Sequence, residues 1–227
     1  MNVNAIVPSP VKPLLPEQKA MPAETQLSAP NVTPPLSAKE QLARDFYTRE
    51  EEPWKKATIK VIDDDSTIVR AMTKEEYLHH TQIMSDLDLE IMQCKFDKFR
   101  KSLIDLRPDL AGMNISYTLG DDAQVKILDP EQTFNENQLE WLTKSMNGIP
   151  DFRETVQDHA RKVMTLVDHD TETFGNRYVL NLSNFQDVID YGKIMTVRNQ
   201  DELSDAWIKQ VQEKGQLRED LLVDVKA

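Results

Sequence analysis

Hydrophobic residues recur at helical spacing over much of the chain, and the longest such stretch covers residues 74–106. It begins with the capping-box pattern Thr73-x-x-Glu76 and ends just ahead of Pro108. Its second half carries an apolar seam at coiled-coil spacing, formed by Leu89, Met92, Phe96, Phe99, Leu103 and Leu106. The pattern predicts one long helix that acts as the spine of the fold. Because the seam is short, it favours packing within the chain over a dimer zipper, and both interpretations stay open.

Further helical patterns precede and follow this stretch. They cover residues 37–52, 135–147, 151–168, 183–192 and 201–214. Because very few residues separate the second and third of these ranges, the two helices are expected to pack as an antiparallel pair. The helix near residue 183 is expected to take its N-cap from Ser183 or Asn184 and to end at Gly192, since glycine commonly terminates helices.

Alternating patterns predict two β-hairpins. Residues 57–62 and 67–71 are β-branched runs that flank an acidic turn at positions 63–65. Residues 115–119 and 125–127 alternate between apolar and polar positions around a second turn. A further short strand is expected at residues 178–182. The predicted fold class is therefore α+β and mainly helical, with a long central helix and two short hairpins packed with helices.

Proline content separates an N-terminal arm from the rest of the chain. Eight of the twelve prolines lie within the first 35 residues, and no aromatic residue precedes Phe46. Such an arm cannot bury enough apolar surface to offset its ordering entropy, so residues 1–36 are predicted to be disordered. A single helical α+β domain is expected over residues 37–215, with a possible internal boundary near 108–113. The charged end, residues 216–227, is expected to fray.

The net charge of −12 narrows the classes of partner. Lysines and glutamates cancel over residues 1–40, so the negative charge lies in the predicted domain. An acidic surface repels phosphate groups, which disfavours nucleic acid and membrane partners. No stretch approaches the roughly 18 apolar residues of a membrane span, and prolines interrupt the N-terminus where a Sec-type signal needs an apolar core. The expected location is the cytoplasm, or outside the cell by a Sec-independent route.

Residues Thr58–Met72 resemble the first strand and acidic pocket of two-component receiver domains, in which clustered aspartates hold magnesium. The resemblance goes no further than this segment. A receiver also requires a later apolar strand that ends in the phosphoacceptor aspartate, and further strands that end in Thr or Ser and in Lys. Here a long amphipathic helix follows instead. The three aspartates at positions 63–65 are therefore interpreted as an acidic hairpin turn.

Other candidate constellations lack the spacing that their chemistry needs. Residues 168–172 place carboxylates like the start of a calcium loop, but an EF-hand requires glycine and glutamate where Thr173 and Val179 stand. The glycines are too far apart along the chain to form a phosphate-binding loop. Glu76 and His80 lie four residues apart on the predicted long helix and make at most a two-ligand half-site for a metal.

Cys94 is the only cysteine, which excludes an intramolecular disulfide. It lies beside the apolar seam, where a packed and inert thiol is expected. The sequence thus supplies no catalytic, cofactor-binding or metal-ligating residue. Core anchoring is the default role of its large apolar residues, and some of them also form the candidate interaction surface. These are Phe96, Phe99, Leu103, Trp141 and Trp207.

Three functional hypotheses follow from this pattern. The first is a non-enzymatic protein–protein interaction module that binds another protein, with the arm as a tether. The second is an effector exported by a bacterial type III apparatus. Residues 1–16 contain no acidic side chain and are rich in Asn, Ser and Pro, which resembles the unstructured export signals of such effectors. The third is an enzyme of unrecognised class that uses scattered carboxylates. The oligomeric state and the identity of the partner stay open.

Overall fold

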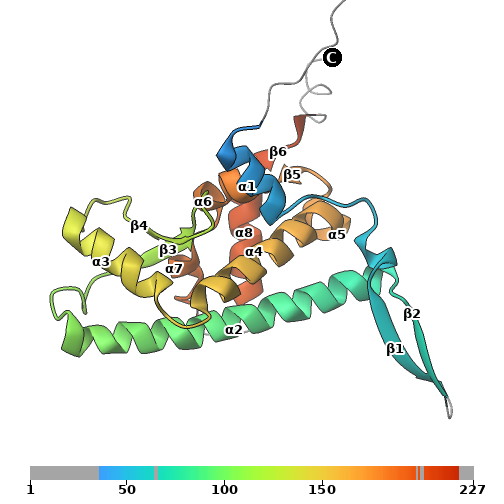
Figure 1. The fold of residues 1–227 in the computed structure, drawn as a ribbon, viewed down its shortest axis with the longest axis horizontal. Helices are drawn as coiled ribbons and strands as arrows, with labels where there is room; N and C mark the ends of the chain where they lie inside the picture. The colour runs from blue at the N-terminus through green and yellow to red at the C-terminus, as the bar shows by residue number, and fades with distance from the viewer. Residues whose placement is uncertain (1–35, 64–65, 198, 200–201, 220–227) are drawn as a thin grey trace, which may run out of the picture. The chain divides into compact units, whose positions relative to one another are not determined.

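A computed structural model describes residues 36–63, 66–197, 199 and 202–219. Figure 1 shows an α+β fold that is mainly helical, as predicted, with a long helix at residues 74–106. The helices are α1 Ala38–Phe46, the 3-10 turn η1 Pro53–Lys55, α2 Lys74–Leu106, α3 Glu136–Asn147, α4 Phe152–His169, α5 Thr171–Phe174, α6 Leu182–Val188, α7 Tyr191–Ile194 and α8 Leu203–Lys214. The strands are β1 Thr58–Asp63, β2 Ser66–Ala71, β3 Ser116–Leu119, β4 Val125–Leu128, β5 Tyr178–Val179 and β6 Gln216–Leu217.

Several predictions fall on residues outside those described. The arm predicted to be disordered, residues 1–36, lies outside the described residues except for Leu36, and the export-like composition of residues 1–16 lies wholly outside them. The last part of the predicted tail, residues 220–227, lies outside them as well. Two aspartates of the acidic turn, Asp64 and Asp65, also lie outside the described residues. Between the described ends, Leu110 is fully buried in the common hydrophobic core, although it belongs to the segment where the sequence allowed an internal boundary.

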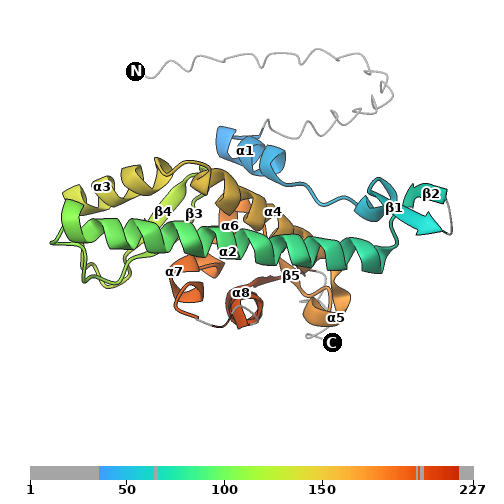
Figure 2. The same ribbon diagram turned by 90° about the horizontal axis from the view of Figure 1, so that it is seen from below.

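α2 and α4 form an antiparallel pair that underlies the rest of the described fold (Figure 2). The start of α2 is fixed by the expected capping box, in which the Thr73 hydroxyl accepts from the Glu76 N–H and the Glu76 carboxylate accepts from the Thr73 N–H. Two ion pairs mark the register of the pair. The Lys162 ammonium lies 2.6 Å from Asp88, and that of Lys95 lies 3.9 Å from Asp151. The predicted seam of α2 therefore packs within the chain.

The β3–β4 hairpin lies against this helix pair and carries the centre of the core. Strand pairing runs from Ser116↔Leu128 to Leu119↔Val125. Tyr117 of β3 is fully buried, and its ring centroid lies 4.9 Å from that of Phe96 on α2. The same ring lies 5.5 Å from Phe152 on α4 and 5.5 Å from Tyr191 on α7. One aromatic side chain thus joins four elements, and aromatic pairs of this kind stabilise by about 0.5–1.5 kcal/mol each beyond area burial.

The C-terminal segment departs from the prediction of a frayed tail. Residues 216–217 form β6, which pairs antiparallel with β5 through Tyr178↔Leu217 and Val179↔Gln216. The Arg218 N–H then donates to the Arg177 carbonyl at 2.9 Å. The charged sequence around Gln216 predicts a frayed end, because its partner strand lies almost forty residues earlier and leaves no local signal.

The two predicted hairpins differ in their surroundings. β3–β4 packs with helices as expected, whereas β1–β2 projects from the helical body (Figures 1 and 2). The register of β1–β2 runs from Thr58↔Ala71 to Asp63↔Ser66 and agrees with the predicted strands. Its β-branched residues satisfy the strand pattern although no described helix packs behind them, a property that strand propensity cannot reveal.

α3 and α4 do not form the expected antiparallel pair. They follow one another along α2 in Figures 1 and 2, because α3 packs mainly against β4 while α4 packs mainly against α2. Asp151, at the junction, adopts a left-handed backbone conformation with φ of 57°. The short connection therefore redirects the chain without folding it back.

Gly192 does not terminate a helix, contrary to the prediction. It lies inside α7, and the preceding helix α6 takes its N-cap from Asn181, whose side chain accepts from the N–H groups of Ser183 and Asn184. α7 approaches β3 so closely that a Cβ atom at position 192 would lie 2.5 Å from the Cα of Ser116. Glycine is thus required here for contact between backbones, not for a turn.

We predict that Gly192→Ala lowers the free energy of unfolding by at least about 2 kcal/mol, because backbone atoms of β3 must move to admit the methyl group. Gly112→Ala is the matched control, since no atom lies within 4 Å of its added Cβ. It should change stability by less than about 1 kcal/mol. Urea unfolding followed by circular dichroism measures both, and equal effects would contradict the proposed close packing.

His159 of α4 is a buried titratable group within the core. Its Nδ1 lies 2.7 Å from the Tyr191 hydroxyl, and its ring stands edge-on to Trp207 with centroids 6.5 Å apart. Among the described residues, its Nε2 has no hydrogen-bond partner. Burial lowers the pKa of His159 to about 3. The folded state therefore holds the neutral imidazole over a pH range in which the unfolded chain, with a pKa near 6.5, binds a proton.

We predict that stability falls as the pH is lowered from 6.5 to 5, with His159 contributing up to about 1.4 kcal/mol per pH unit. The sign follows from the lowered folded-state pKa, because the contribution is complete above pH 6.5 and is lost towards pH 3. His159→Gln should show a shallower dependence in urea unfolding. The exposed His79→Gln variant is the control and should keep the wild-type slope. An unchanged slope in His159→Gln would count against this account.

Candidate functional site

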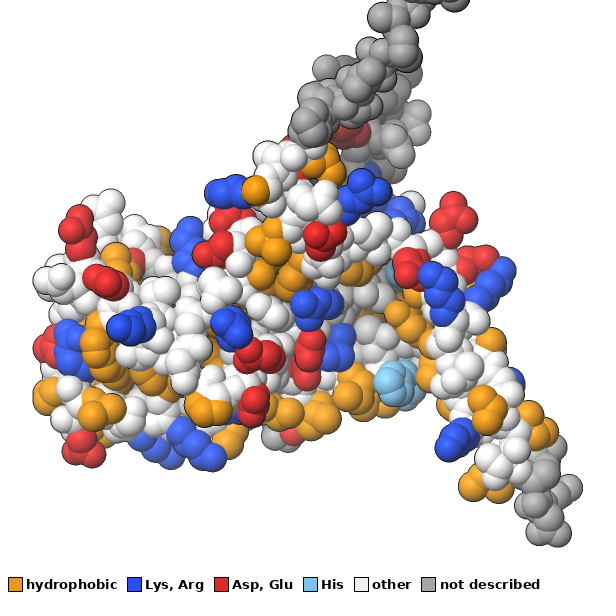
Figure 3. All heavy atoms as spheres, viewed as in Figure 1, with side chains coloured by type: hydrophobic (Ala, Val, Ile, Leu, Met, Phe, Trp, Pro, Cys, Tyr) orange, Lys and Arg blue, Asp and Glu red, His pale blue; other side chains and the backbone are white. Residues whose placement is uncertain are grey.

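The β1–β2 hairpin presents apolar side chains on both of its faces. Because side chains alternate along a strand, Ile59, Val61 and Ile68 share one face, and Ile62 and Val69 lie on the other. The side chain of Ile62 is 81% exposed and that of Val69 is 59% exposed. Figure 3 shows hydrophobic side chains gathered on this projection. A contiguous apolar surface of this kind is a common mark of a binding site.

The root of the hairpin is tied to α2 by a bidentate ion pair. The Arg70 guanidinium donates to both carboxylate oxygens of Glu76, at 2.7 and 2.6 Å. This pairing, together with the Thr73 N–H, lowers the pKa of Glu76 to about 2. Both oxygens are thus engaged by Arg70, so the half-site considered for Glu76 and His80 is not formed in this arrangement. The Glu76 carboxylate instead fixes the hairpin to the first turn of the long helix.

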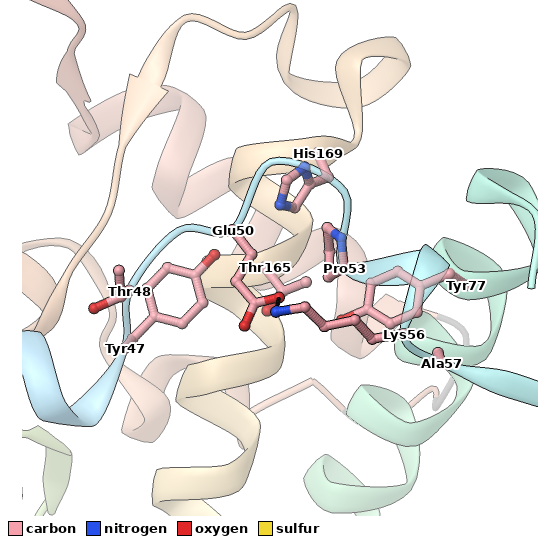
Figure 4. A pocket seen from close by; sticks show the side chains of 9 residues that line it. All are labelled: Tyr47, Thr48, Glu50, Pro53, Lys56, Ala57, Tyr77, Thr165 and His169. Atoms are coloured by element: carbon pink, nitrogen blue, oxygen red, sulfur yellow. Dashed lines mark hydrogen bonds and ion pairs between the residues drawn. The ribbon is translucent and has the colours of Figure 1, made fainter. Parts of the chain in front are cut away.

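A pocket of about 390 Å³ opens beside this root (Figure 4). Its lining comes from the segment after α1, from η1 and the two residues that precede β1, and from facing turns of α2 and α4. Tyr47 and Tyr77 lie on opposite sides of it, with the side chains of Glu50 and Lys56 between them and His169 above. The Lys56 ammonium lies 2.7 Å from the Glu50 carboxylate. The cavity therefore combines two aromatic walls with a charged pair.

Tyr47 leads from the pocket to a buried ion pair. Its hydroxyl donates to Asp168 at 2.8 Å, and the other oxygen of Asp168 lies 2.6 Å from the Arg218 guanidinium. Burial, and then the negative charge of Asp168, raise the pKa of Tyr47 well above its usual value. The phenol therefore stays protonated and keeps its donor role. This network joins the segment after α1, the end of α4 and the segment after β6.

The wall formed by His169 is held by aromatic contacts. The Trp54 ring of η1 meets His169 edge-on with centroids 5.6 Å apart, and the Lys74 ammonium lies 5.8 Å from the Trp54 centroid. Burial lowers the pKa of His169, so its ring is neutral at pH 7. The pocket thus offers tyrosine hydroxyls and a neutral imidazole, which suit hydrogen bonding to a polar side chain or a backbone segment.

The residues predicted as an interaction surface belong mostly to the core. Phe96, Phe99, Leu103 and Trp207 are buried, so the prediction of a surface is wrong for these four. The remaining one, Trp141, is half-buried, stacked 6.4 Å from Phe99 and covered by the Arg107 guanidinium at 4.9 Å. The correct seam was recognised in the sequence, but its apolar side faces α4 and β3 rather than a partner. Leu106, the last seam residue, is 66% exposed.

Two smaller expectations also change. Cys94 is exposed, not packed, because it lies on the side of α2 opposite the buried line through Met92 and Phe96. The acidic residues at 168–170 have structural partners, since Asp168 binds Arg218 and Asp170 caps α5 through the N–H groups that follow it. Within the part of the chain that the structure describes, no group of three or more His, Cys, Asp or Glu side chains could hold a metal ion. No described helix is long and apolar enough to cross a membrane.

Comparisons with protein-family models, curated proteins and solved structures give no match for this chain.

We predict that Arg218→Ala destabilises the fold by about 3–5 kcal/mol, because it leaves the Asp168 carboxylate buried beside a single hydroxyl donor. Lys39→Ala is the control, since it removes an exposed ion pair with Asp121 at a similar distance and should leave the free energy of unfolding nearly unchanged. Thermal and urea unfolding report both values. Similar small losses for the two variants would show that the Asp168 network does not anchor the C-terminal segment.

Proposed function

We propose that this chain is a protein–protein interaction module that binds its partner through the β1–β2 hairpin. The observation that carries the proposal is the exposure of apolar side chains on both faces of a projecting ribbon. A two-stranded ribbon is at most marginally stable in water by itself. Covering Ile62 and Val69 would remove apolar surface from water at roughly 25 cal/mol per Å². A partner protein can provide that cover.

The edges of the ribbon suggest the mode of binding. Among the described residues, β1 and β2 form a sheet of two strands, so each has one main-chain edge without a described neighbouring strand. An extended segment of a partner can add to such an edge by main-chain hydrogen bonds, while side chains on both faces give specificity. The bidentate pair of Arg70 with Glu76 supports this mode, because it orients the ribbon before the partner arrives.

The pocket of Figure 4 extends the same surface. Ala57 lines the pocket and directly precedes β1, so a segment bound along β1 reaches the cavity between Tyr47 and Tyr77. Aromatic walls with a few polar groups are typical of pockets that receive an anchoring side chain. The export hypothesis rests on residues 1–16, outside the described residues, and no observation on the described residues favours it.

We predict that the double variant Ile62→Lys/Val69→Lys keeps its fold but loses its partner. Both side chains are exposed, so the free energy of unfolding should change by less than about 1 kcal/mol. The matched control is Thr58→Lys/Thr67→Lys, which adds the same charge to the same face of the ribbon. Tagged proteins are used to capture partners from an extract of the cells that produce this chain, with quantitative mass spectrometry as the readout.

A protein counts as the partner when the wild type and the control retain it, the double variant loses it at least about tenfold, and the purified pair binds in calorimetry. Equal recovery by all three forms of the chain would refute binding through this face. A matching loss in the control would assign the effect to added charge, and would also refute the proposal.

A further inference from the structure

A second concave surface lies near the start of α2 and shares no lining residue with the Figure 4 pocket. It is a groove of about 640 Å³, within the roughly 300–1,000 Å³ that is usual for ligand pockets. The first four turns of α2, the end of α4, the short helix α5 and the first turns of α8 form its walls. We refer to it as the α2–α8 groove.

Part of the lining of the α2–α8 groove is apolar, and we call this part its floor. Leu78 of α2, Leu166 of α4 and Ile208 of α8 line it, so three different helices contribute one branched side chain each. Leu78 and Ile208 are only partly buried, which leaves part of their surface open to an occupant. An apolar floor favours a ligand that carries at least one hydrophobic group.

The rim is acidic. Five carboxylates line the groove: Glu75, Asp86, Asp170, Glu172 and Asp205. Two of them have internal partners, since Asp86 accepts from Gln82 and Ser204, and Asp170 caps α5. The other three form no ion pair with any described lysine, arginine or histidine.

Positive groups around the groove offset only part of this charge. The basic residues that line the groove are Lys74 and His79. Glu75 and Asp205 lie in the first turns of α2 and α8, where the helix dipole adds about half a positive charge per helix. Against five carboxylates these contributions leave the groove negative. An anion such as phosphate is therefore disfavoured there.

We infer that the α2–α8 groove binds a basic amphipathic peptide segment of a partner protein, with an apolar side chain on the floor and lysine or arginine side chains at the rim. Charge complementarity identifies this occupant, because the unpaired carboxylates of Glu172 and Asp205 line the same groove as the apolar floor residues and come from two different helices, α5 and α8. The floor distinguishes it from a free polyamine, which offers charge without a branched hydrophobic group. The inference concerns a surface separate from the hairpin, and its test uses no hairpin variant.

The test measures binding of a fluorescent octapeptide of lysine, arginine and leucine to the full chain by fluorescence anisotropy. A second probe replaces each leucine with serine, and spermine is added as a competitor. The groove variant is Glu172→Lys/Asp205→Lys. Its matched control, Glu136→Lys/Glu140→Lys, makes the same charge change at exposed positions of α3, one of them in the first turn of that helix.

The wild type and the α3 control should bind the leucine probe equally, and the groove variant at least about tenfold more weakly. The serine probe should also bind at least about tenfold more weakly than the leucine probe. Ile208→Ala, which keeps all charges, should weaken only the leucine probe. Equal losses in both double variants would reduce the effect to net charge and overturn the inference. Absence of binding at about 1 mM, equal binding of the serine probe, or displacement by spermine at equal concentration would overturn it as well.

Discussion

The antiparallel contact between α2 and α4 is the constraint on which the rest of the described structure depends. Leu89, Met92 and Phe96 on α2 are removed from water by this contact and by β3, and a fully buried side chain of this size contributes about 1.5–3 kcal/mol. The Lys162–Asp88 pair sets the register of the two helices. β3, α3, α5, β5 and α8 pack on this pair directly, whereas α6, β4 and β6 are held through those elements. The β1–β2 hairpin is attached to the end of α2. The long helix therefore supports the rest of the described fold, and its apolar seam packs mostly inside the core.

Local signals in the sequence located most of the helices. Ser37, Thr73 and Asn135 each form a capping box with the residue three places later, so these starts depend on a few neighbouring residues. Contacts between distant residues were out of reach. β6 forms by pairing with β5 at Tyr178. Gly192, predicted to end a helix, is instead needed because the backbone of Ser116 lies close to it. Both depend on tertiary packing, which periodicity and propensity do not encode.

The candidate site shows the same difference between local sequence signals and tertiary contacts. The strands of β1–β2 were predicted, but the exposure of Ile62 and Val69 depends on which elements cover the ribbon. Conversely, Phe96 and Trp207 look like anchors for a partner until their burial is known. The hydrogen bonds that link Tyr47, Asp168 and Arg218 join residues that are far apart in the sequence, and no sequence motif predicts them. Sequence patterns identify amphipathic elements, while the fold decides which of their faces remain free.

The attachment of the ribbon to α2 has a mechanical consequence. Arg70 and Glu76 join the ribbon to a helix of 33 residues, which at about 1.5 Å per residue is about 50 Å long. Only Met72 and Thr73 separate β2 from that helix, and both ends of this junction are held by hydrogen bonds. The ribbon can therefore change its orientation only if the first turn of α2 moves with it or the Arg70–Glu76 pair breaks. This ion pair thus couples the orientation of the ribbon to that of the long helix.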